Sequence, residues 1–215
     1  MAEPIIIVGA GQAAAQAVAS LRSGGYAGDL VLFGEEPHLP YQRPPLSKTF
    51  LAGETTAGRL ELRPQSFYEE QNVDLRLGQR IVRIDPGAGQ VMTRDGRATR
   101  FSQLLIATGT RARTLPLAGD ALTGVHHIRA IRDVEQFRAE FTPGARLVVI
   151  GGGYIGLEVA AKARMIGLVV TVIEGQQRIL ARVVSAQTAA CLAGLHAQNG
   201  VDIRTGVGVG GLIGA

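Results

Sequence analysis

Cysteine is almost absent from this chain of 215 residues, in which Cys191 is the single example. One cysteine cannot form an intrachain disulfide or a dithiol redox pair, and such usage is typical of a reducing compartment. The four histidines and this cysteine show no spacing typical of a zinc site, so we expect no metal centre. We expect Cys191 itself to be a buried, small apolar residue.

Long apolar runs are also missing. Although 46% of the residues are hydrophobic, no run reaches the ~18 apolar residues of a membrane-spanning helix. The opening residues, MAEPIIIVGAG, combine an acidic start with a short apolar run, which fits neither a signal peptide nor a membrane anchor. We therefore expect a soluble cytoplasmic protein without a membrane partner.

Lysine is scarce as well, because Lys48 and Lys162 are the only two among 22 basic residues and the other 20 are arginines. With 18 acidic residues the formal net charge is +4, and no block of like charge stands out. The sequence therefore indicates no nucleic-acid partner. A mildly basic surface can steer an acidic protein partner, and a solvated surface of mixed charge is the alternative.

Glycine, in contrast, is abundant: 29 residues are about 13% of the chain, compared with ~7% in an average protein. Two segments repeat the same pattern of an apolar run, a glycine turn, a helical stretch and a second apolar run. The first copy extends from residues 5–8 through GAGQAA to residues 30–33, and the second from residues 146–150 through GGGYIG to residues 169–173. Short β-branched runs beside glycine predict buried parallel strands joined by a crossover helix.

Both glycine turns fit the G-x-G-x-x-G/A fingerprint of dinucleotide-binding proteins. The first glycine makes the turn, the second lets a pyrophosphate approach the backbone, and the small third residue lets the helix pack on the strand. The pyrophosphate is then bound by N–H groups at the start of the helix. These positions are Gly9, Gly11 and Ala14 in the first copy, and Gly151, Gly153 and Gly156, with Tyr154 and Ile155 between them, in the second.

A carboxylate ends the second strand of each copy: Glu35 lies 26 residues after Gly9, and Glu174 lies 23 residues after Gly151. This is near the ~20 residues that place a carboxylate on the ribose hydroxyls. Glu174 favours NADH over NADPH because a carboxylate there repels a 2′-phosphate. Arg178 lies nearby and would weaken this preference unless it is solvated or caps the following turn.

Two dinucleotide sites in one chain indicate one cofactor held as a prosthetic group and a second that reduces it, which is the arrangement of a flavoprotein oxidoreductase. The alternative is that these are packing glycines of an open α/β sheet.

The region between the copies is strand-rich. Together with Asp-Pro-Gly and Asp-Gly turns, three short strands predict a β-meander, at residues 81–85, 90–93 and 103–107. The loop-like stretch at residues 112–124 predicts the boundary between domains at residues 1–113 and 114–215. After the second copy we expect a helix at residues 185–199 and a strand at residues 201–204.

Three motifs resemble the FAD-dependent ferredoxin reductases, which serve bacterial cytochromes P450 and Rieske-type dioxygenases: PYQRPPLSK at residues 40–48, ATG at residues 107–109 and GGGYIGLE at residues 151–158. The resemblance implies an α/β glutathione-reductase-like fold with two Rossmann-like dinucleotide-binding domains, both incomplete in this chain. It also implies hydride transfer from NADH to FAD, followed by transfer of single electrons to a [2Fe–2S] ferredoxin.

The resemblance implies roles for individual residues. Lys48 lies beside the flavin with Glu158 as its partner, and Tyr154 forms an aromatic gate over the nicotinamide pocket, so these three are the catalytic candidates. A surface lysine, a carboxylate favoured by the helix dipole and a packing aromatic are the alternatives. The residues implied to bind FAD are Gly9, Gly11, Ala13, Ala14, Glu35, Arg43, Lys48, Ile81, Ala107, Thr108, Gly109 and Arg129.

The resemblance also sets expectations about what is missing. The region after the first copy has no cysteine, unlike disulfide reductases, so electrons leave the flavin directly for an external acceptor. Members of the family continue further, with the rest of the NADH domain, a second FAD segment and a C-terminal interface domain. We therefore expect a truncated chain with weak FAD retention and little activity.

Two other functions remain open at this point. The first is a related NADH-dependent FAD reductase with another acceptor, such as a rubredoxin, monodehydroascorbate or nitrite reductase, or an apoptosis-inducing-factor-like protein. The second is a non-catalytic dinucleotide-binding module.

Overall fold

The computed structural model describes residues 3–114 and 116–214, which form two compact units. The first unit contains Met1–Gln42 and Gly58–Thr110, and the second contains Arg43–Ala57 and Arg111–Ala215. The segment Arg43–Ala57, which contains most of the PYQRPPLSK motif, thus packs with residues far later in the chain. The domain limits expected at residues 113 and 114 stay a prediction.

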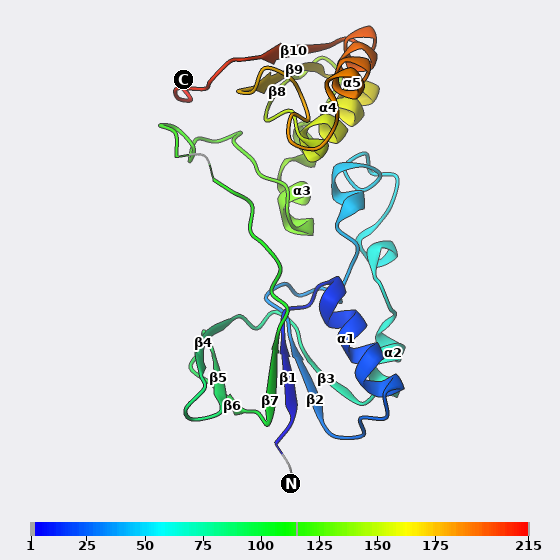
Figure 1. Cartoon of the computed structure of the whole chain (residues 1–215), viewed down its shortest axis with the longest axis vertical. Helices are drawn as coiled ribbons and strands as arrows, with labels where there is room; N and C mark the ends of the chain where they lie inside the picture. The colour runs from blue at the N-terminus through cyan, green and yellow to red at the C-terminus, as the bar shows by residue number, and fades with distance from the viewer. Residues whose placement is uncertain (1–2, 115, 215) are drawn as a thin grey trace. The chain divides into compact units, whose positions relative to one another are not determined.

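The first unit is built on a parallel sheet. Its strands are β1 (Ile5–Val8), β2 (Leu30–Phe33), β3 (Val73–Arg76) and β7 (Gln103–Ile106), in the order β3-β2-β1-β7 (Figure 1). Helix α1 (Gln12–Ser23) connects β1 with β2, and α2 (Gln65–Glu70) precedes β3. The expected strand, glycine turn, helix and strand of the first copy are therefore confirmed.

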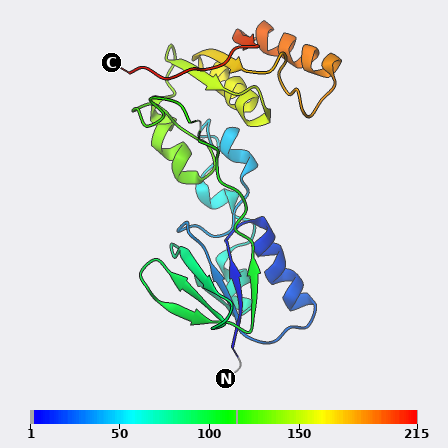
Figure 2. The same cartoon turned by 60° about the vertical axis from the view of Figure 1, so that its left-hand side comes forward.

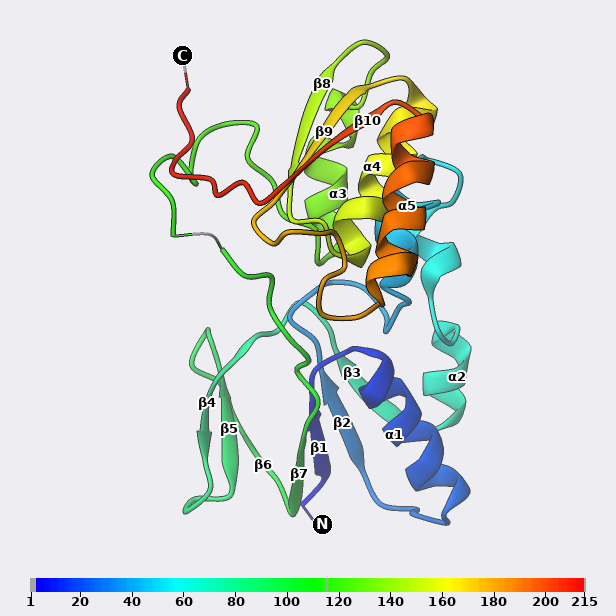
Figure 3. The same cartoon turned by 45° about the horizontal axis from the view of Figure 1, so that its top comes forward.

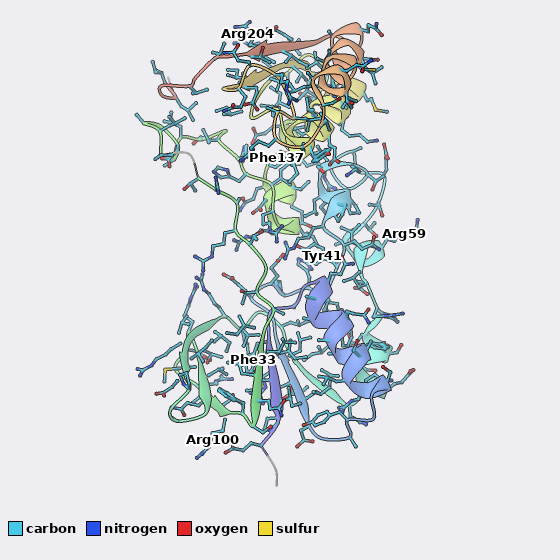
Figure 4. All side chains as sticks on the ribbon, in the orientation of Figure 1. Phe33, Tyr41, Arg59, Arg100, Phe137 and Arg204 are labelled. Atoms are coloured by element: carbon cyan, nitrogen blue, oxygen red, sulfur yellow. The ribbon has the colours of Figure 1, made fainter. Side chains whose placement is uncertain are left out.

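Both faces of this sheet are covered, which is why β1 and β2 are apolar throughout. On one face Ile7 and Leu32 pack against Ala14 and Val18 of α1. On the other face Phe33 and its neighbours pack against a meander, which lies across the sheet from α1 (Figure 2). Phe33 (Figure 4) is 1% exposed. The Arg76 guanidinium lies 5.2 Å from its ring centroid.

The meander differs from the expected one in its third strand. It consists of β4 (Ile81–Asp85), β5 (Gln90–Thr93) and β6 (Ala98–Arg100), all paired antiparallel. The run expected as its last strand, residues 103–107, instead forms β7 and pairs parallel with β1. The grouping in sequence was wrong because the partner of β7 lies almost a hundred residues earlier in the chain.

The second unit repeats the parallel arrangement with three strands. They are β8 (Arg146–Ile150), β9 (Val169–Glu174) and β10 (Val201–Thr205), in the order β10-β9-β8 (Figure 3). Helix α4 (Tyr154–Ile166) packs its Ala160 and Ala163 on Val170 and Val172 of β9. The remaining elements are α3 (Ile131–Phe137), α5 (Ala186–Gln198) and the 3₁₀ turns η1 (Pro44–Ser47), η2 (Ala57–Leu60) and η3 (Arg138–Glu140), of which η2 spans the junction of the two units.

Helix α5 confirms the expected helix to within one residue at each end, whereas one of its side chains differs from the expectation. The Ser185 hydroxyl caps the helix by accepting the Thr188 N–H, and Gly200 follows the helix with φ +82°. Cys191 is exposed, so the expectation of a buried residue was wrong. The reason is the face it occupies: Ala189, not Cys191, is the residue of α5 that is buried in the core.

The longest helices among the described residues are α4 and α5, with 13 residues each. Neither these nor any other described helix has the length and apolarity needed to cross a membrane.

Tyr68 in α2 provides a test of the packing of the first unit. Its side chain is 0% exposed, its hydroxyl has no hydrogen-bond partner among the described residues, and burial raises its pKa to about 12. We expect Tyr68→Phe to raise the free energy of unfolding by about 1 kcal/mol, because an unpaired buried hydroxyl is removed. Chemical denaturation followed by circular dichroism measures this change.

The pH dependence of this effect has a definite sign. The Tyr68 pKa is raised from 10.0 to about 12, so between these pH values the hydroxyl ionises in the unfolded chain but not in the folded one. The free energy of unfolding of the wild type is therefore unaffected by this ionisation below pH 10 and falls as the pH rises from 10 through 12. The Phe variant lacks this loss, and its advantage over the wild type therefore grows above pH 10. Tyr26→Phe, at a hydroxyl in an exposed contact with the Asp29 carbonyl, is the control and should change stability little. An equal response of both variants would contradict the assignment.

Candidate functional site

The first glycine turn is shaped by a backbone that crosses it. Gly9 follows β1 with φ +117°, and its N–H donates to the Phe33 carbonyl at 2.8 Å. The Ala107 N–H donates to the Val8 carbonyl at 2.8 Å. A Cβ atom on Gly9 would lie 2.2 Å from the Ala107 carbonyl oxygen, so no other residue fits there without moving the backbone. The structure thus brings together the first fingerprint and the ATG motif at residues 107–109.

The second glycine turn makes a similarly close contact within itself. Gly151 has φ +110°, and its N–H donates to the Ile173 carbonyl at 2.8 Å. A Cβ atom on Gly156 would lie 2.1 Å from the Gly151 carbonyl oxygen. This is the close packing of helix on turn that the third position of the fingerprint requires.

The helices after the two turns begin without the side-chain caps found at α3 and α5. Neither α1, which starts after Gly11, nor α4, which starts after Gly153, has a side-chain cap or an acidic residue in its first turn. Helix α5, in contrast, is capped by Ser185, and the Asp133 carboxylate accepts the Ala130 N–H at the start of α3. The first N–H groups of α1 and α4 are therefore free to bind an anion, as the pyrophosphate of a dinucleotide requires.

The carboxylates after each second strand have different partners. Glu35 is exposed and forms an ion pair with Arg80 at 3.0 Å. Glu174 accepts the Gly152 N–H at 2.7 Å and the Gln176 N–H at 2.8 Å, which holds its carboxylate at the second glycine turn. A negative charge fixed there disfavours a 2′-phosphate.

Arg178, which lies close to Glu174 in the sequence, donates to backbone carbonyls. Its guanidinium donates to the carbonyls of Ala181 and Val184, each at 2.8 Å. Arg178 therefore caps the turn that follows it, as one alternative expected, and is occupied in a role other than phosphate binding.

The expected pair of Lys48 and Glu158 is formed within the second unit. Lys48 Nζ lies 2.7 Å from Glu158 Oε1, with side-chain exposures of 44% and 31%. Lys48 directly follows η1, which two prolines start, and Leu46 and Phe50 on either side of it are buried. The Pro-Pro turn and these apolar anchors position the lysine on helix α4.

The second lysine of the chain pairs with the same segment. Lys162 Nζ lies 2.9 Å from Glu54 Oε1, and Lys162 follows Glu158 by four residues on the same face of α4. Two ion pairs thus join the segment Arg43–Ala57 to helix α4. The segment provides the lysine of one pair and the carboxylate of the other.

Two further residues expected at FAD contact each other. Arg43 Nη1 donates to the Arg129 carbonyl at 2.5 Å, and the Arg129 N–H donates to the Asp133 carboxylate at 2.9 Å. The backbone near Arg129 is therefore held from both sides.

The side chain expected as a gate is accessible. Tyr154 is the first residue of α4, and its side chain is 56% exposed; Ile155 beside it is 55% exposed. An aromatic ring open to solvent beside a glycine turn is available to a planar ligand.

The site residues expected from the sequence fall into two sets. The first unit contains Gly9, Gly11, Ala13, Ala14, Glu35, Ile81, Ala107, Thr108 and Gly109. The second unit contains Arg43, Lys48, Arg129, Gly151, Gly153, Tyr154, Ile155, Gly156, Glu158 and Glu174. Their roles toward a cofactor stay predictions.

The sequence reasoning missed Ser47, which contacts Glu158, and Arg80, which contacts Glu35. It also missed the neighbouring ion pair of Glu54 and Lys162. The spacing of Glu158 and Lys162 by four residues was a signal that both contact one partner segment. The others gave no local signal, because their partners are distant in sequence.

Two parallel βαβ units, each with an uncapped helix after a glycine turn and a carboxylate after the second strand, define a dinucleotide-binding α/β protein. The model of the pyridine nucleotide-disulphide oxidoreductase family matches residues 3–215, and the chain belongs to this family.

Its relatives confirm the resemblance to ferredoxin reductases. Rhodocoxin reductase of Rhodococcus erythropolis is 42% identical over 205 residues, which are 95% of this chain and 48% of that protein. The ferredoxin–NAD(+) reductase component of a p-cumate 2,3-dioxygenase system of Pseudomonas putida is 44% identical over 203 residues, 94% of this chain and 50% of that protein. The chain thus spans about half the length of the curated relatives it matches.

Solved structures confirm the fold class. The covalent complex of putidaredoxin reductase with putidaredoxin matches 99% of this chain and 52% of its own, with TM-score 0.92 and 39% identity. The ferredoxin reductase for the CYP199A2 system of Rhodopseudomonas palustris matches the same shares with TM-score 0.94 and 36% identity.

The first glycine turn yields a test of its geometry. Gly9→Ala should lower the free energy of unfolding by about 3 kcal/mol, because a Cβ atom strains a left-handed residue and collides with the Ala107 carbonyl. Urea denaturation monitored by tyrosine fluorescence, with three of the four tyrosines in the first unit, measures this loss.

Gly25→Ala is the matched control for this test. Gly25 has φ +86° but nothing within 4 Å of the added Cβ atom, so only the backbone strain of about 1 kcal/mol applies. Equal losses in the two variants would show that the contact with Ala107 is not a constraint.

Proposed function

We propose that this chain contributes the FAD-binding and NADH-binding parts of a flavoprotein reductase. The reaction moves a hydride from NADH to FAD and then single electrons to a [2Fe–2S] ferredoxin. The observation that supports this most is the ion pair of Lys48 and Glu158, because it fixes an ammonium against the helix that begins at the second glycine turn. A packing role for the two fingerprints alone would not require it.

The residues of the chain divide the work of binding. The free N–H groups of α1 and α4 bind the two pyrophosphates, and Glu35 and Glu174 bind ribose hydroxyls. Glu174 held at its turn, with Arg178 engaged elsewhere, supports NADH rather than NADPH. The proposed domains are residues 1–113 for FAD and 114–215 for NADH.

Bound FAD would supply a ring that accepts a hydride and releases electrons one at a time. Lys48 holds a compact positive charge that Glu158 keeps in place, and such a charge stabilises an electron-rich ring. Tyr154 covers the nicotinamide site until the nucleotide displaces it. The single cysteine supports a cytoplasmic location.

The acceptor has two candidates. Rhodocoxin reductase, the p-cumate dioxygenase component and the complex with putidaredoxin support a ferredoxin. A rubredoxin–NAD(+) reductase of Pseudomonas putida is 45% identical over 185 residues, 86% of this chain and 48% of that protein, and supports a rubredoxin as the second candidate.

Nucleotide preference tests the proposed NADH site. The wild-type chain should bind NADH more tightly than NADPH, and Glu174→Gln should weaken NADH binding about tenfold, because a charge-assisted hydrogen bond to the ribose is lost. Glu174→Gln should also reduce the ratio of the NADPH Kd to the NADH Kd. Fluorescence titration of both nucleotides measures this, with Glu54→Gln as a control of equal charge change. Equal affinity of the wild type for both nucleotides would contradict the assignment.

Flavin reduction tests the reaction. Because weak FAD retention and little activity are expected, the chain is incubated with excess FAD, and NADH is added without oxygen. The flavin absorbance should bleach slowly, and Lys48→Met should slow the bleaching further, at least about tenfold. Addition of a [2Fe–2S] ferredoxin or a rubredoxin then identifies the acceptor by which one is reduced. A chain that binds FAD and NADH but shows no bleaching would be a binding module, and the proposal would fail.

A further inference from the structure

The carboxylate of Glu158 has two partners, and they are consecutive residues. Lys48 Nζ occupies Oε1 at 2.7 Å, and the Ser47 hydroxyl donates to Oε2 at 2.5 Å. Ser47 is 4% exposed and is one of the few buried polar side chains of the described residues. Its other acceptor, the Pro44 carbonyl, is at 3.4 Å, so the carboxylate is the better partner.

The Lys48 and Ser47 contacts differ in how well each can fix the orientation of the Glu158 carboxylate. Lys48 is 44% exposed, so water and salt compete for both charges of its ion pair, and the pair alone does not fix the orientation of the carboxylate. A hydrogen bond from a buried hydroxyl to a carboxylate is short, directional and protected from water. The orientation of the Glu158 carboxylate is therefore set by Ser47 more than by Lys48.

We infer that Ser47 is a positioning residue: by fixing one oxygen of Glu158, it aims the other at Lys48 and holds the ammonium in place. The importance of this position for electron transfer rests on the proposed function, whereas the ordering of Lys48 does not. Without the hydroxyl, the carboxylate rotates and Lys48 retains only the Pro44 carbonyl at 3.3 Å.

The chain contains a matched control for a purely structural role. Glu54 and Lys162 join the same segment to the same helix face one turn away, without touching Glu158. If Ser47 only fastened the segment to α4, the loss of the pair of Glu54 and Lys162 should have the same effect on Lys48. If Ser47 acts through Glu158, it should not.

The scarcity of lysine makes a direct test practical. A chain labelled with ¹⁵N at the lysine side chains gives two ammonium signals, which Lys162→Arg assigns. In Ser47→Ala the ammonium protons of Lys48 should exchange with water about tenfold faster, while those of Lys162 are unchanged. Ser47→Thr, which keeps the hydroxyl, should restore the slow exchange at Lys48, and Glu54→Gln should affect Lys162 alone.

The result that overturns the inference is equally specific. Slow exchange at Lys48 in Ser47→Ala would show that the hydroxyl does not position it. Faster exchange at Lys48 in Glu54→Gln would show that attachment of the segment, not orientation of Glu158, orders the lysine. Circular dichroism confirms that each variant is folded, and Ser47→Thr decides the question if the alanine variant is not.

A kinetic test links the inference to the proposed reaction. With FAD bound, Ser47→Ala should lower the rate of flavin reduction at saturating NADH several-fold and leave the KM for NADH unchanged, and Ser47→Thr should restore the rate. Glu54→Gln should leave both unchanged. If the wild-type chain reduces no flavin, the proposed function fails, and the lysine exchange rates still decide the role of Ser47.

Discussion

Backbone atoms pass one another at both glycine turns more closely than any side chain permits. The Ala107 carbonyl occupies the place of a side chain on Gly9, and the Gly151 carbonyl occupies that of Gly156. At the second turn the contact packs the start of α4 on the turn itself, where the Gly152 N–H donates to the Glu174 carboxylate that follows β9. The geometry of both glycine turns therefore depends on a steric constraint rather than on any one polar contact.

The two lysines and the arginines of this chain have different partners. A chain whose basic residues are otherwise arginines has its two lysines in contact with one segment and one helix. Several arginines donate instead to backbone carbonyls, as Arg43 and Arg178 do. A compact ammonium on a flexible stem can be aimed by a neighbouring carboxylate, which suits Lys48 to a position that a planar guanidinium would fit poorly.

The features predicted from the sequence are those with a local pattern. Both glycine turns, the strands beside them and helix α5 follow from apolar runs, glycine spacing and a serine cap. The pairing of β7 with β1, the attachment of the segment Arg43–Ala57 and the contact of Ser47 with Glu158 could not be predicted, because each depends on a partner about a hundred residues away. The exposure of Cys191 was missed for a different reason: a helix rich in small apolar residues does not show which face is covered.

The different spans of the two glycine contacts have a consequence for biosynthesis. The second turn closes on itself within five residues, so it can form as soon as its helix begins. The contact of the first turn cannot form until Ala107 has been synthesised, and β1 lacks one of its two neighbours until β7 has left the ribosome. Within the first unit, the earliest strand to be made is thus the last to gain both neighbours, and during synthesis one edge of it stays open to wrong pairing with other chains.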